Sequence, residues 1–211
     1  MMDLVSYSTK HNESNGEDNR DGNDNNFSNN FGFEGIHAAA QIRDERDRAR
    51  RGLFSHLILS PGIPMILGGD EFGRSQGGNN NAYNQDRKEF GIGWSAYDDK
   101  FLTFVRALIS LRKESIAIAD SVFDNSAYGD SLINYEYRRN GRTLATVIWN
   151  CGDESKSIDI SENSDIFQSE VTVVDSHRGS IEVVKVAPEA TYEVDVAPFS
   201  IYAAFAADVE H

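Results

Sequence analysis

The feature that most constrains this chain is a short apolar run that leads directly into a glycine-rich, polar segment. Residues 63–67 read Ile-Pro-Met-Ile-Leu, 68–72 read Gly-Gly-Asp-Glu-Phe, and 79–84 read Asn-Asn-Asn-Ala-Tyr-Asn. A buried parallel strand delivers polar side chains to a binding face at its carboxyl end in this way. Carboxylates and amides hydrogen-bond well to hydroxyl groups, so the pattern predicts a site for a hydroxyl-rich ligand such as a carbohydrate. The candidate substrate-binding residues are Asp70, Glu71, Asn79, Asn80, Asn81 and Tyr83.

The composition limits the classes of function that the chain can have. The formal net charge is −14, which argues against nucleic-acid binding, because that requires Lys and Arg to neutralise phosphates. No apolar stretch approaches the roughly 20 residues of a membrane span, so we expect no membrane partner. Cys151 is the only cysteine, and no signal-peptide pattern follows Met1. We therefore expect a protein of the reducing cytoplasm.

The first half of the chain has the pattern of α/β structure. Residues 36–59 are expected to form a helix, and Ser60-Pro61-Gly62 ends it. The apolar run is then expected to form a strand over 63–68. A second helix is expected over 100–113, preceded by acidic residues and ending in basic ones, the order that the helix dipole favours.

The second half has the pattern of antiparallel β structure. Strands are expected over 132–138 and 143–149, joined by Asn140-Gly141, a strong signal for a two-residue hairpin turn. No helical pattern interrupts the rest, which predicts an all-β sandwich over 116–211. The further expected strands are 171–175, 181–186, 192–196 and 201–205.

A long polar segment, residues 8–35, is rich in Asn, Asp, Gly and Ser. Loops of this length are usually functional or disordered. A calcium-binding loop with Gly22 at its sixth position would require a bidentate Glu at its twelfth position, but that residue is Ser28. The sequence therefore predicts no metal site.

Seven segments in the first half carry a family resemblance through their order and spacing. They are Asp3-Leu4-Val5-Ser6-Tyr7, Lys10-His11-Asn12, Asn15-Gly16-Glu17, Asn19-Arg20-Asp21-Gly22, Ser28-Asn29-Asn30, Pro64-Met65-Ile66-Leu67-Gly68-Gly69-Asp70-Glu71 and Asn79-Asn80-Asn81-Ala82-Tyr83-Asn84-Gln85-Asp86. Together they resemble the bacterial glycogen debranching enzymes, which belong with the isoamylases in the α-amylase superfamily. The resemblance is dense over residues 3–115, and beyond them only the all-β character agrees.

The resemblance implies a (β/α)8 barrel followed by an antiparallel β-sandwich. Residues 1–115 would be the C-terminal part of the catalytic barrel and 116–211 the C-terminal β-sandwich domain. A whole barrel takes about 250 residues, so this part is incomplete. The implied activity is hydrolysis of α-1,6 branch linkages in glycogen or limit dextrin, without a cofactor.

The resemblance assigns no catalytic residue to this chain. The family's nucleophile and acid/base follow earlier barrel strands, and its third catalytic residue normally lies just before the motif that begins at Asp3. A retaining glycosidase needs two carboxyl groups about 5–5.5 Å apart. Asp70 and Glu71 are poor substitutes, because adjacent residues at a strand end point to opposite faces.

Several residues carry two interpretations. Asn79–Asn81 and Tyr83 either line glucan subsites or satisfy backbone groups in a long turn. Arg20 and Asp21 are expected to form a buried pair that fixes the polar loop rather than to contact substrate, and His11 to be a hydrogen-bonding loop residue. His37 and His56, on the first helix, are expected to pack or face solvent. We expect Phe101 and Phe104 in the core, and Trp94 and Trp149 to be packed.

Three hypotheses follow. In the first, the chain is the C-terminal part of a debranching enzyme and is inactive alone. In the second, it is a non-catalytic module that binds branched α-glucan or complements a separately encoded N-terminal barrel part. In the third, it is a remnant that does not fold stably. We expect 116–211 to fold alone and 1–115 to be loosely ordered or self-associating, since its strand lacks parallel neighbours.

Overall fold

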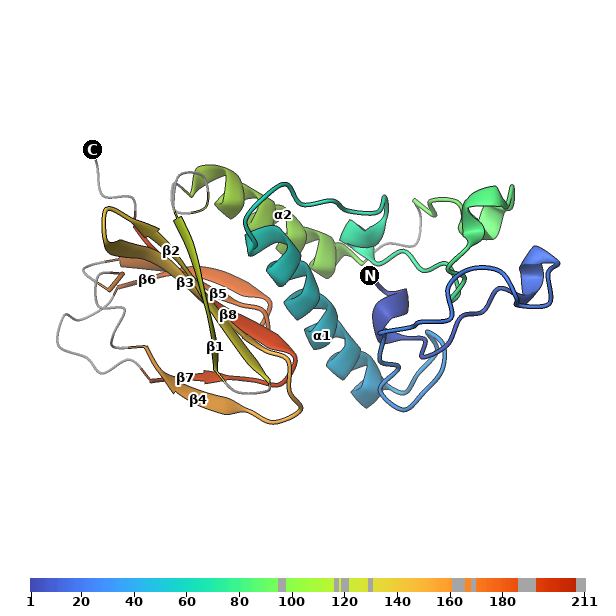
Figure 1. Cartoon of the computed structure of the whole chain (residues 1–211), viewed down its shortest axis with the longest axis horizontal. Coiled ribbons are helices and arrows are strands. Elements are labelled where there is room, and N and C mark those ends of the chain that lie inside the picture. The colour runs from blue at the N-terminus through green and yellow to red at the C-terminus, as the bar shows by residue number, and fades with distance from the viewer. Residues whose placement is uncertain are drawn as a thin grey trace. The chain divides into compact units, whose positions relative to one another are not determined.

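The computed structural model describes residues 1–94, 98–115, 118, 122–128, 131–160, 166–167, 170–185 and 193–207 (Figure 1). By their contacts, the residues divide into two units. Unit 1 is Met1–Arg50 with Met65–Leu102, and unit 2 is Arg51–Pro64 with Thr103–His211. The division into domains at residue 115 stays a prediction. Among the described residues, no helix combines the length and apolarity that crossing a bilayer requires.

Two α-helices are present in the described part of the chain, and both run from one unit into the other. Helix α1 spans Ala40–Leu59 and α2 spans Asp99–Glu114. The expected helix over 100–113 is confirmed, and Phe101 and Phe104 are 3% and 4% exposed, which confirms their predicted burial. The expected helix over 36–59 begins four residues late, because the first backbone bond of helical spacing runs from the N–H of Arg43 to the carbonyl of Ala39. His37 therefore precedes the helix.

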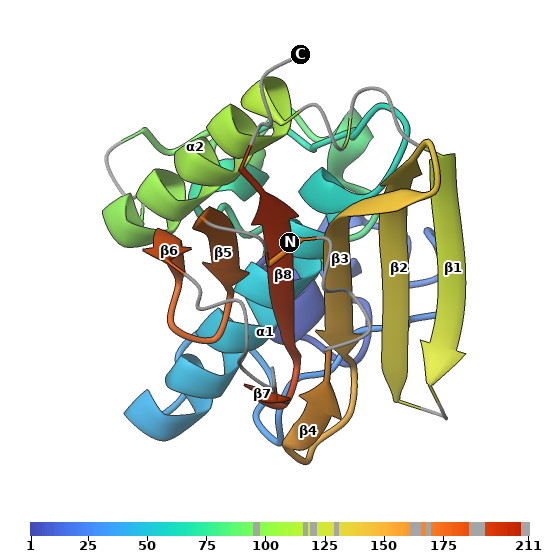
Figure 2. The same cartoon turned by 90° about the vertical axis from the view of Figure 1, so that its left-hand side faces the viewer.

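Unit 2 is built on a six-stranded sheet in which every pair of strands is antiparallel. Figure 2 shows the strands in the spatial order β1-β2-β3-β8-β5-β6. Their bounds are β1 Val122–Tyr128, β2 Leu132–Arg139, β3 Arg142–Asn150, β5 Glu170–Asp175, β6 Ser180–Lys185 and β8 Ser200–Ala206. The position of β8 between β3 and β5 brings the end of the domain into the middle of its sheet.

The hairpin between β2 and β3 confirms the sequence prediction. Arg139 pairs with Arg142, and the two residues between them, Asn140 and Gly141, have φ of 52° and 80°. Asn and Gly tolerate this left-handed conformation, which matches the twist of the flanking strands. A register shift between Tyr137 and Arg138 places a bulge near the turn.

A second, two-stranded sheet packs on the first. It consists of β4 (Lys156–Asp159) and β7 (Glu193–Val196). Apolar side chains from both sheets form one core, so the predicted antiparallel, mostly β domain is confirmed. The buried members of this core are Ile148, Ile160, Ile166, Phe167, Val171, Val196 and Ala204.

The C-terminal end of α1 is held by polar side chains from distant parts of the sequence. Arg112 donates to the carbonyls of Ile58, Ser60 and Gly62, which lie at and beyond the end of α1. The hydroxyl of Tyr137 donates to the carbonyl of Leu59. The last carbonyls of a helix lack partners inside the helix, so these bonds close its C-terminus.

The expected strand over 63–68 is wrong. These residues have no regular secondary structure, and Ile63, Met65 and Leu67 are 97%, 88% and 57% exposed. A parallel strand is stabilised by the ladders on its two sides. All strand pairs among the described residues are antiparallel and lie in unit 2, so the apolar run has no neighbour with which to pair.

Two further strands, β1 and β4, were not predicted from the sequence. Strand β1 carries Asp, Asn and Ser in its middle, and β4 has only four residues, so neither has a strong β pattern. Of the expected strands, the ends at Val186 and Tyr192 lie outside the described residues.

Unit 1 is made of the first part of α1, the first residues of α2 and long loops with five 3-10 turns. These turns are Asp3–Val5, Glu13–Asn15, Asp70–Phe72, Ala82–Asn84 and Lys88–Phe90. The loops carry the candidate site.

One buried cation organises the core of unit 1. The guanidinium of Arg50 is ion-paired with Asp47 and Asp98 and lies 4.0 Å above the ring of Phe101. Burial raises the pKa of Asp98, but the hydrogen bond from the Phe101 N–H and the charge of Arg50 outweigh it, so the pKa lies below its ordinary value. Asp98 thereby caps α2 as a carboxylate.

Candidate functional site

The candidate site is formed where loop 68–90 meets loop 3–35. Asp3 holds the first of these loops through its carboxylate. Its Oδ1 accepts a hydrogen bond from the Ser75 hydroxyl at 2.5 Å, and its Oδ2 accepts one from the Gln76 N–H at 2.8 Å. A residue 72 positions away thus fixes the turn that precedes the asparagines.

Gly78 lies where the two loops come closest. The N–H of His11 donates to its carbonyl at 2.9 Å, and its φ is +77°. A Cβ at this position would lie 2.7 Å from Cδ1 of Tyr7 and 2.8 Å from Cδ2 of His11. Both the left-handed backbone and this close approach require glycine.

The three consecutive asparagines bind the opposite loop. The N–H of Asn80 donates to Oδ1 of Asn12 at 3.0 Å, and Nδ2 of Asn12 donates back to Oδ1 of Asn80 at 2.8 Å. Asn79 donates to Oδ1 of Asn15 at 2.7 Å. Asn79 is 4% exposed and Asn12 is fully buried. These amides therefore join two loops that are distant in sequence.

Asp21 receives the third asparagine. Its Oδ2 accepts from Nδ2 of Asn81 at 2.8 Å and from Nδ2 of Asn15 at 2.7 Å. These two hydrogen bonds stabilise the carboxylate and lower the pKa of Asp21. The expected buried pair of Arg20 with Asp21 is wrong. The Arg20 side chain is 80% exposed and lies 3.7 Å from Asp18, while Oδ2 of Asp21 accepts from the amides of Asn15 and Asn81.

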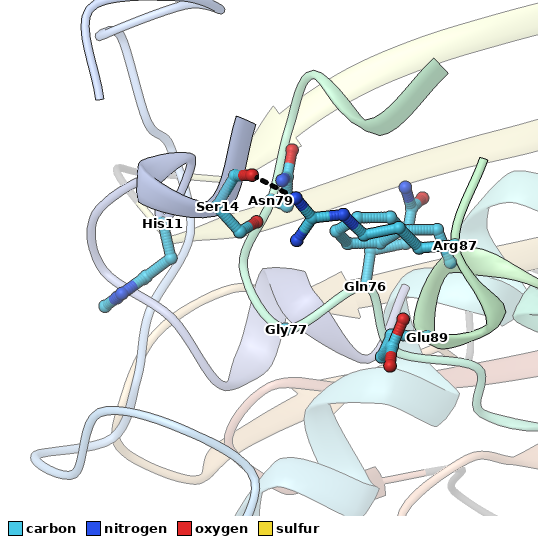
Figure 3. Close-up of a pocket in the computed structure, with 8 residues that line it drawn as sticks. His11, Ser14, Gln76, Gly77, Asn79, Arg87 and Glu89 are labelled. Atoms are coloured by element: carbon cyan, nitrogen blue, oxygen red, sulfur yellow. Dashed lines mark hydrogen bonds between the residues drawn. The ribbon is translucent and has the colours of Figure 1, made fainter. Parts of the chain in front are cut away.

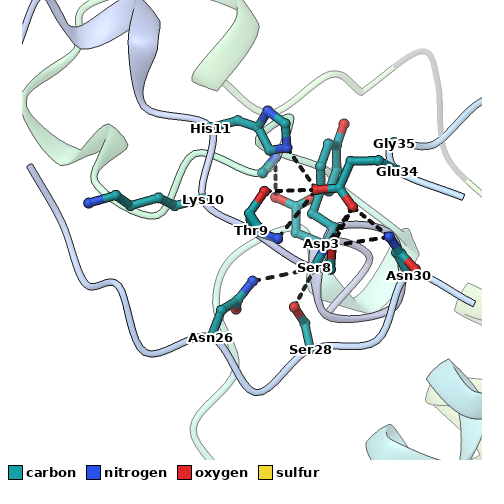
Figure 4. A network of polar contacts seen from close by, with 12 residues as sticks. Asp3, Ser8, Thr9, Lys10, His11, Asn26, Ser28, Asn30, Glu34 and Gly35 are labelled. Atoms are coloured by element: carbon teal, nitrogen blue, oxygen red, sulfur yellow. Dashed lines mark hydrogen bonds and ion pairs between the residues drawn. The ribbon is translucent and has the colours of Figure 1, made fainter. Parts of the chain in front are cut away.

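A second polar network surrounds Glu34 (Figure 4). The carboxylate accepts hydrogen bonds from the N–H and hydroxyl groups of Ser8 and Thr9 at 2.8–3.3 Å. Asn30 donates to it at 2.7 Å, and Nε2 of His11 lies 2.8 Å away. Burial raises the pKa of Glu34, but these hydrogen bonds outweigh it and hold the pKa far below its usual range. His11 is thus a hydrogen-bonding loop residue, as predicted.

Beside the asparagines lies a hollow of ≈ 260 Å³ (Figure 3). Arg87 extends over it and donates to the carbonyl of Ser14 at 2.8 Å. Gln76, Glu89 and Phe90 line it as well, so it offers amide, carboxylate and guanidinium groups and one aromatic ring. This is a combination suited to a hydroxyl-rich ligand.

The carboxylates singled out from the sequence are already engaged. Asp70 and Glu71 lie on one 3-10 turn, not at the end of a strand. Asp70 is ion-paired with the N-terminal ammonium of Met1, and Glu71 accepts from the N–H of Gly69 at 2.7 Å. Tyr83 is 89% exposed. Within the described part of the chain, no three His, Cys, Asp or Glu side chains are grouped to hold a metal.

The two tryptophans differ. Trp149 stacks on His56, with ring centroids 4.3 Å apart, as predicted for a packed residue. Trp94 is 72% exposed, so its predicted packing is wrong. Its ring contacts Phe72 with centroids 5.7 Å apart, but it lies in an irregular segment that leaves most of the ring in solvent.

Sequence comparison identifies relatives over most of the chain, although no family model matches. A glycogen debranching enzyme of Serratia proteamaculans is 38% identical over 200 residues, which is 95% of this chain. One of Pectobacterium atrosepticum is 42% identical over 161 residues, or 76% of the chain. The chain is a homologue of the bacterial glycogen debranching enzymes. It spans only about a quarter of their length, 28% and 24% respectively.

Solved structures share the fold at lower identity. The catalytic module of the glycogen-degrading pneumococcal virulence factor SpuA matches 82% of this chain with a TM-score of 0.55 and 15% identity, and is itself covered to 33%. Ttha1563 from Thermus thermophilus matches 79% with a TM-score of 0.54 and 21% identity, and is covered to 32%. The β-sheet domain with its two helices is therefore a fold found within α-amylase-family proteins.

Proposed function

We propose that this chain is the C-terminal part of an isoamylase-type debranching enzyme that hydrolyses α-1,6 branch linkages in glycogen or limit dextrin. The observation that carries the proposal is the 38–42% identity to debranching enzymes over 76–95% of the chain. Residues 1–115 would complete a (β/α)8 barrel and 116–211 would form the β-sandwich behind it. The enzyme would act in the cytoplasm without a cofactor.

The exposed apolar run supports a missing barrel. Ile63, Met65 and Leu67 are large apolar side chains at alternate positions, and each is more than half exposed. Burying such a side chain contributes about 1.5–3 kcal/mol. A barrel built from additional strands would pair this segment on both sides and remove its side chains from water, which is the environment that its composition fits.

The chain alone should not hydrolyse glucan. A retaining mechanism needs a nucleophile and an acid/base about 5–5.5 Å apart on either side of the bond. Glu71 accepts a hydrogen bond from a backbone N–H, and Glu34 is surrounded by donors that hold it ionised. These carboxylates stabilise loops, so the catalytic pair would come from the missing part.

Complementation tests this proposal. The Serratia proteamaculans enzyme would be truncated to remove the segment that this chain matches, and mixed with the purified chain. We expect no release of reducing ends from limit dextrin by either part alone and measurable release by the mixture. Hydrolysis by the isolated chain at enzyme-like rates would refute the assignment, and a mixture that forms a complex without activity would refute the complementing role.

The alternative is a non-catalytic glucan-binding module, and the hollow beside Arg87 and Glu89 favours it. Asp70, Glu71, Asn79, Asn80 and Asn81 would then act by shaping this hollow, while the exposed ring of Tyr83 would remain available for a sugar. Affinity electrophoresis in glycogen gels tests it, with Arg87→Ala/Glu89→Ala as the variant and Lys88→Ala, an exposed neighbour outside the hollow, as the control.

A further inference from the structure

A second hollow, of ≈ 310 Å³, lies entirely within unit 2. It opens on the face of the large sheet that carries β5, β6 and β8, and β7 contributes to its wall. Strand register explains its floor. Asp175 pairs with Tyr202 on one side and Ser180 on the other, and Val173 pairs with Glu182. Side chains directly opposite on antiparallel strands share a face, so these groups form two adjacent rows.

The groups in this hollow differ in how they are engaged. Asp175 accepts hydrogen bonds from the N–H groups of His177 and Arg178 at 2.9 and 3.2 Å, and its other oxygen lies 3.3 Å from Nε of Arg178. The Arg178 side chain is nonetheless 78% exposed, so its remaining donors reach solvent. Asp175 thus orients a guanidinium without covering it.

Three other polar groups are not used by the fold. Within the described part of the chain, the side chains of Tyr202, Glu182 and Asp195 make no hydrogen bond or ion pair with protein groups. Tyr202 is half-buried, and burial together with the Asp175 charge raises the pKa of its phenol, so it stays neutral. In unit 1, by contrast, the asparagine amides are bound to the opposite loop.

The apolar and polar groups that line this hollow favour one class of ligand. Val173, Val184 and Val194 and one face of the Tyr202 ring provide apolar surface, while carboxylates and a guanidinium lie around it. Three carboxylates against one Arg disfavour an anion, and the described residues hold no cluster suited to a metal ion. A neutral sugar, with apolar C–H faces and a periphery of hydroxyls, fits both features. The volume is near the lower limit for ligand pockets, so it suits one or two sugar rings.

We infer that this hollow in the β-domain is a second carbohydrate-binding site, which holds the end of an α-glucan chain independently of the barrel loops. The choice of α-glucan rests on the proposed function, whereas the hollow itself specifies a neutral, hydroxyl-rich ligand. Its role would be to retain polysaccharide while hydrolysis takes place elsewhere in the enzyme.

The test is affinity electrophoresis of the full chain in glycogen gels, with maltotriose as the soluble competitor. The variant is Glu182→Ala/Asp195→Ala, because both side chains are exposed and their loss should not unfold the domain. Tyr202→Phe removes the hydroxyl and keeps the ring. The matched control is Asp153→Ala/Glu154→Ala, which also removes two exposed carboxylates of unit 2 but lies outside the hollow. Urea unfolding of each variant checks the fold.

We expect the double β-domain variant to bind glycogen about tenfold or more weakly, Tyr202→Phe to bind several-fold more weakly, and the control to bind as tightly as the wild type. The inference is overturned if the wild-type chain is not retarded, or if the double variant is retarded equally. Hydrolysis is measured separately by complementation. Retardation without complementation therefore rejects only the proposed function, and complementation without retardation rejects only this second site.

Discussion

Gly52 provides the sharpest test of packing in unit 2. When it is replaced by Ala, helix propensity and tertiary contact predict changes in stability of opposite sign. It lies inside α1 with an ordinary helical φ, so replacement by Ala would by itself stabilise the helix by about 0.8–1.0 kcal/mol. A Cβ at this position, however, would overlap the carbonyl oxygen of Phe199 and lie 3.2 Å from its carbonyl carbon and 3.4 Å from Cα of Ser200.

The contact with the Phe199 backbone should outweigh the gain in helix propensity. The obstructing atoms belong to the backbone at the start of β8, a central strand hydrogen-bonded on both sides, so they cannot move as a side-chain end would. Overpacking of this kind costs about 1–3 kcal/mol, and here we take the upper end. After the propensity gain is subtracted, Gly52→Ala should lower the free energy of unfolding by about 2 kcal/mol.

Urea unfolding followed by Trp149 fluorescence measures this change, since Trp149 stacks on His56, one turn beyond Gly52 on the same helix. A Trp94→Phe background removes the other tryptophan. Gly93→Ala is the control, because a Cβ there meets nothing within 4 Å. If Gly52→Ala instead stabilised the protein by about 1 kcal/mol, as propensity alone requires, the close approach of helix and strand would be refuted.

Three further predictions concern other parts of the molecule. Burial lowers the pKa of His56, so the unfolded state binds a proton more readily than the folded state. The free energy of unfolding should therefore be highest above the unfolded pKa and should decrease as pH falls below about 6.5. The variant His56→Gln should flatten this pH dependence of the urea unfolding midpoint. An equal slope in the variant would exclude His56 as its source. Gly78→Ala should destabilise unit 1 by about 1–3 kcal/mol through strain and overlap with Tyr7, measured as faster proteolysis of residues 1–94; unchanged cleavage would contradict the loop geometry. Hydrogen exchange should protect 116–211 more than 1–115, and uniform protection in a monomer would contradict independent folding of the β-domain.

Local signals predicted much of unit 2 correctly. The turn at Asn140-Gly141 depends on two residues that tolerate positive φ, and the stripe on α2 depends on spacing within one helix. Both are properties of neighbouring residues, so they survive in a chain of any length. The same is true of the helix stop at Ser60-Pro61-Gly62, where α1 ends at Leu59.

The contacts of the candidate site residues could not be predicted from the sequence. Asn79 lines a hollow, yet the side chains of residues 79–81 bind Asn12, Asn15 and Asp21, which are 60 to 68 positions away in sequence. The sequence does not show whether the amide of an asparagine is free or hydrogen-bonded. No pattern in the sequence predicts the second hollow, because only strand register brings Asp175, Glu182 and Tyr202 together.

The sequence by itself determined where the helices of this chain end, where its hairpin turns, and which proteins it is related to, because these depend on adjacent residues and on motifs in order. Tertiary structure alone decided that the apolar run 63–67 is no strand, that Arg20 points into solvent and that the asparagines hold two loops together. A strand, an ion pair and a hydrogen bond each need a partner elsewhere in the chain. Whether that partner lies within reach depends on how distant segments of the chain pack together.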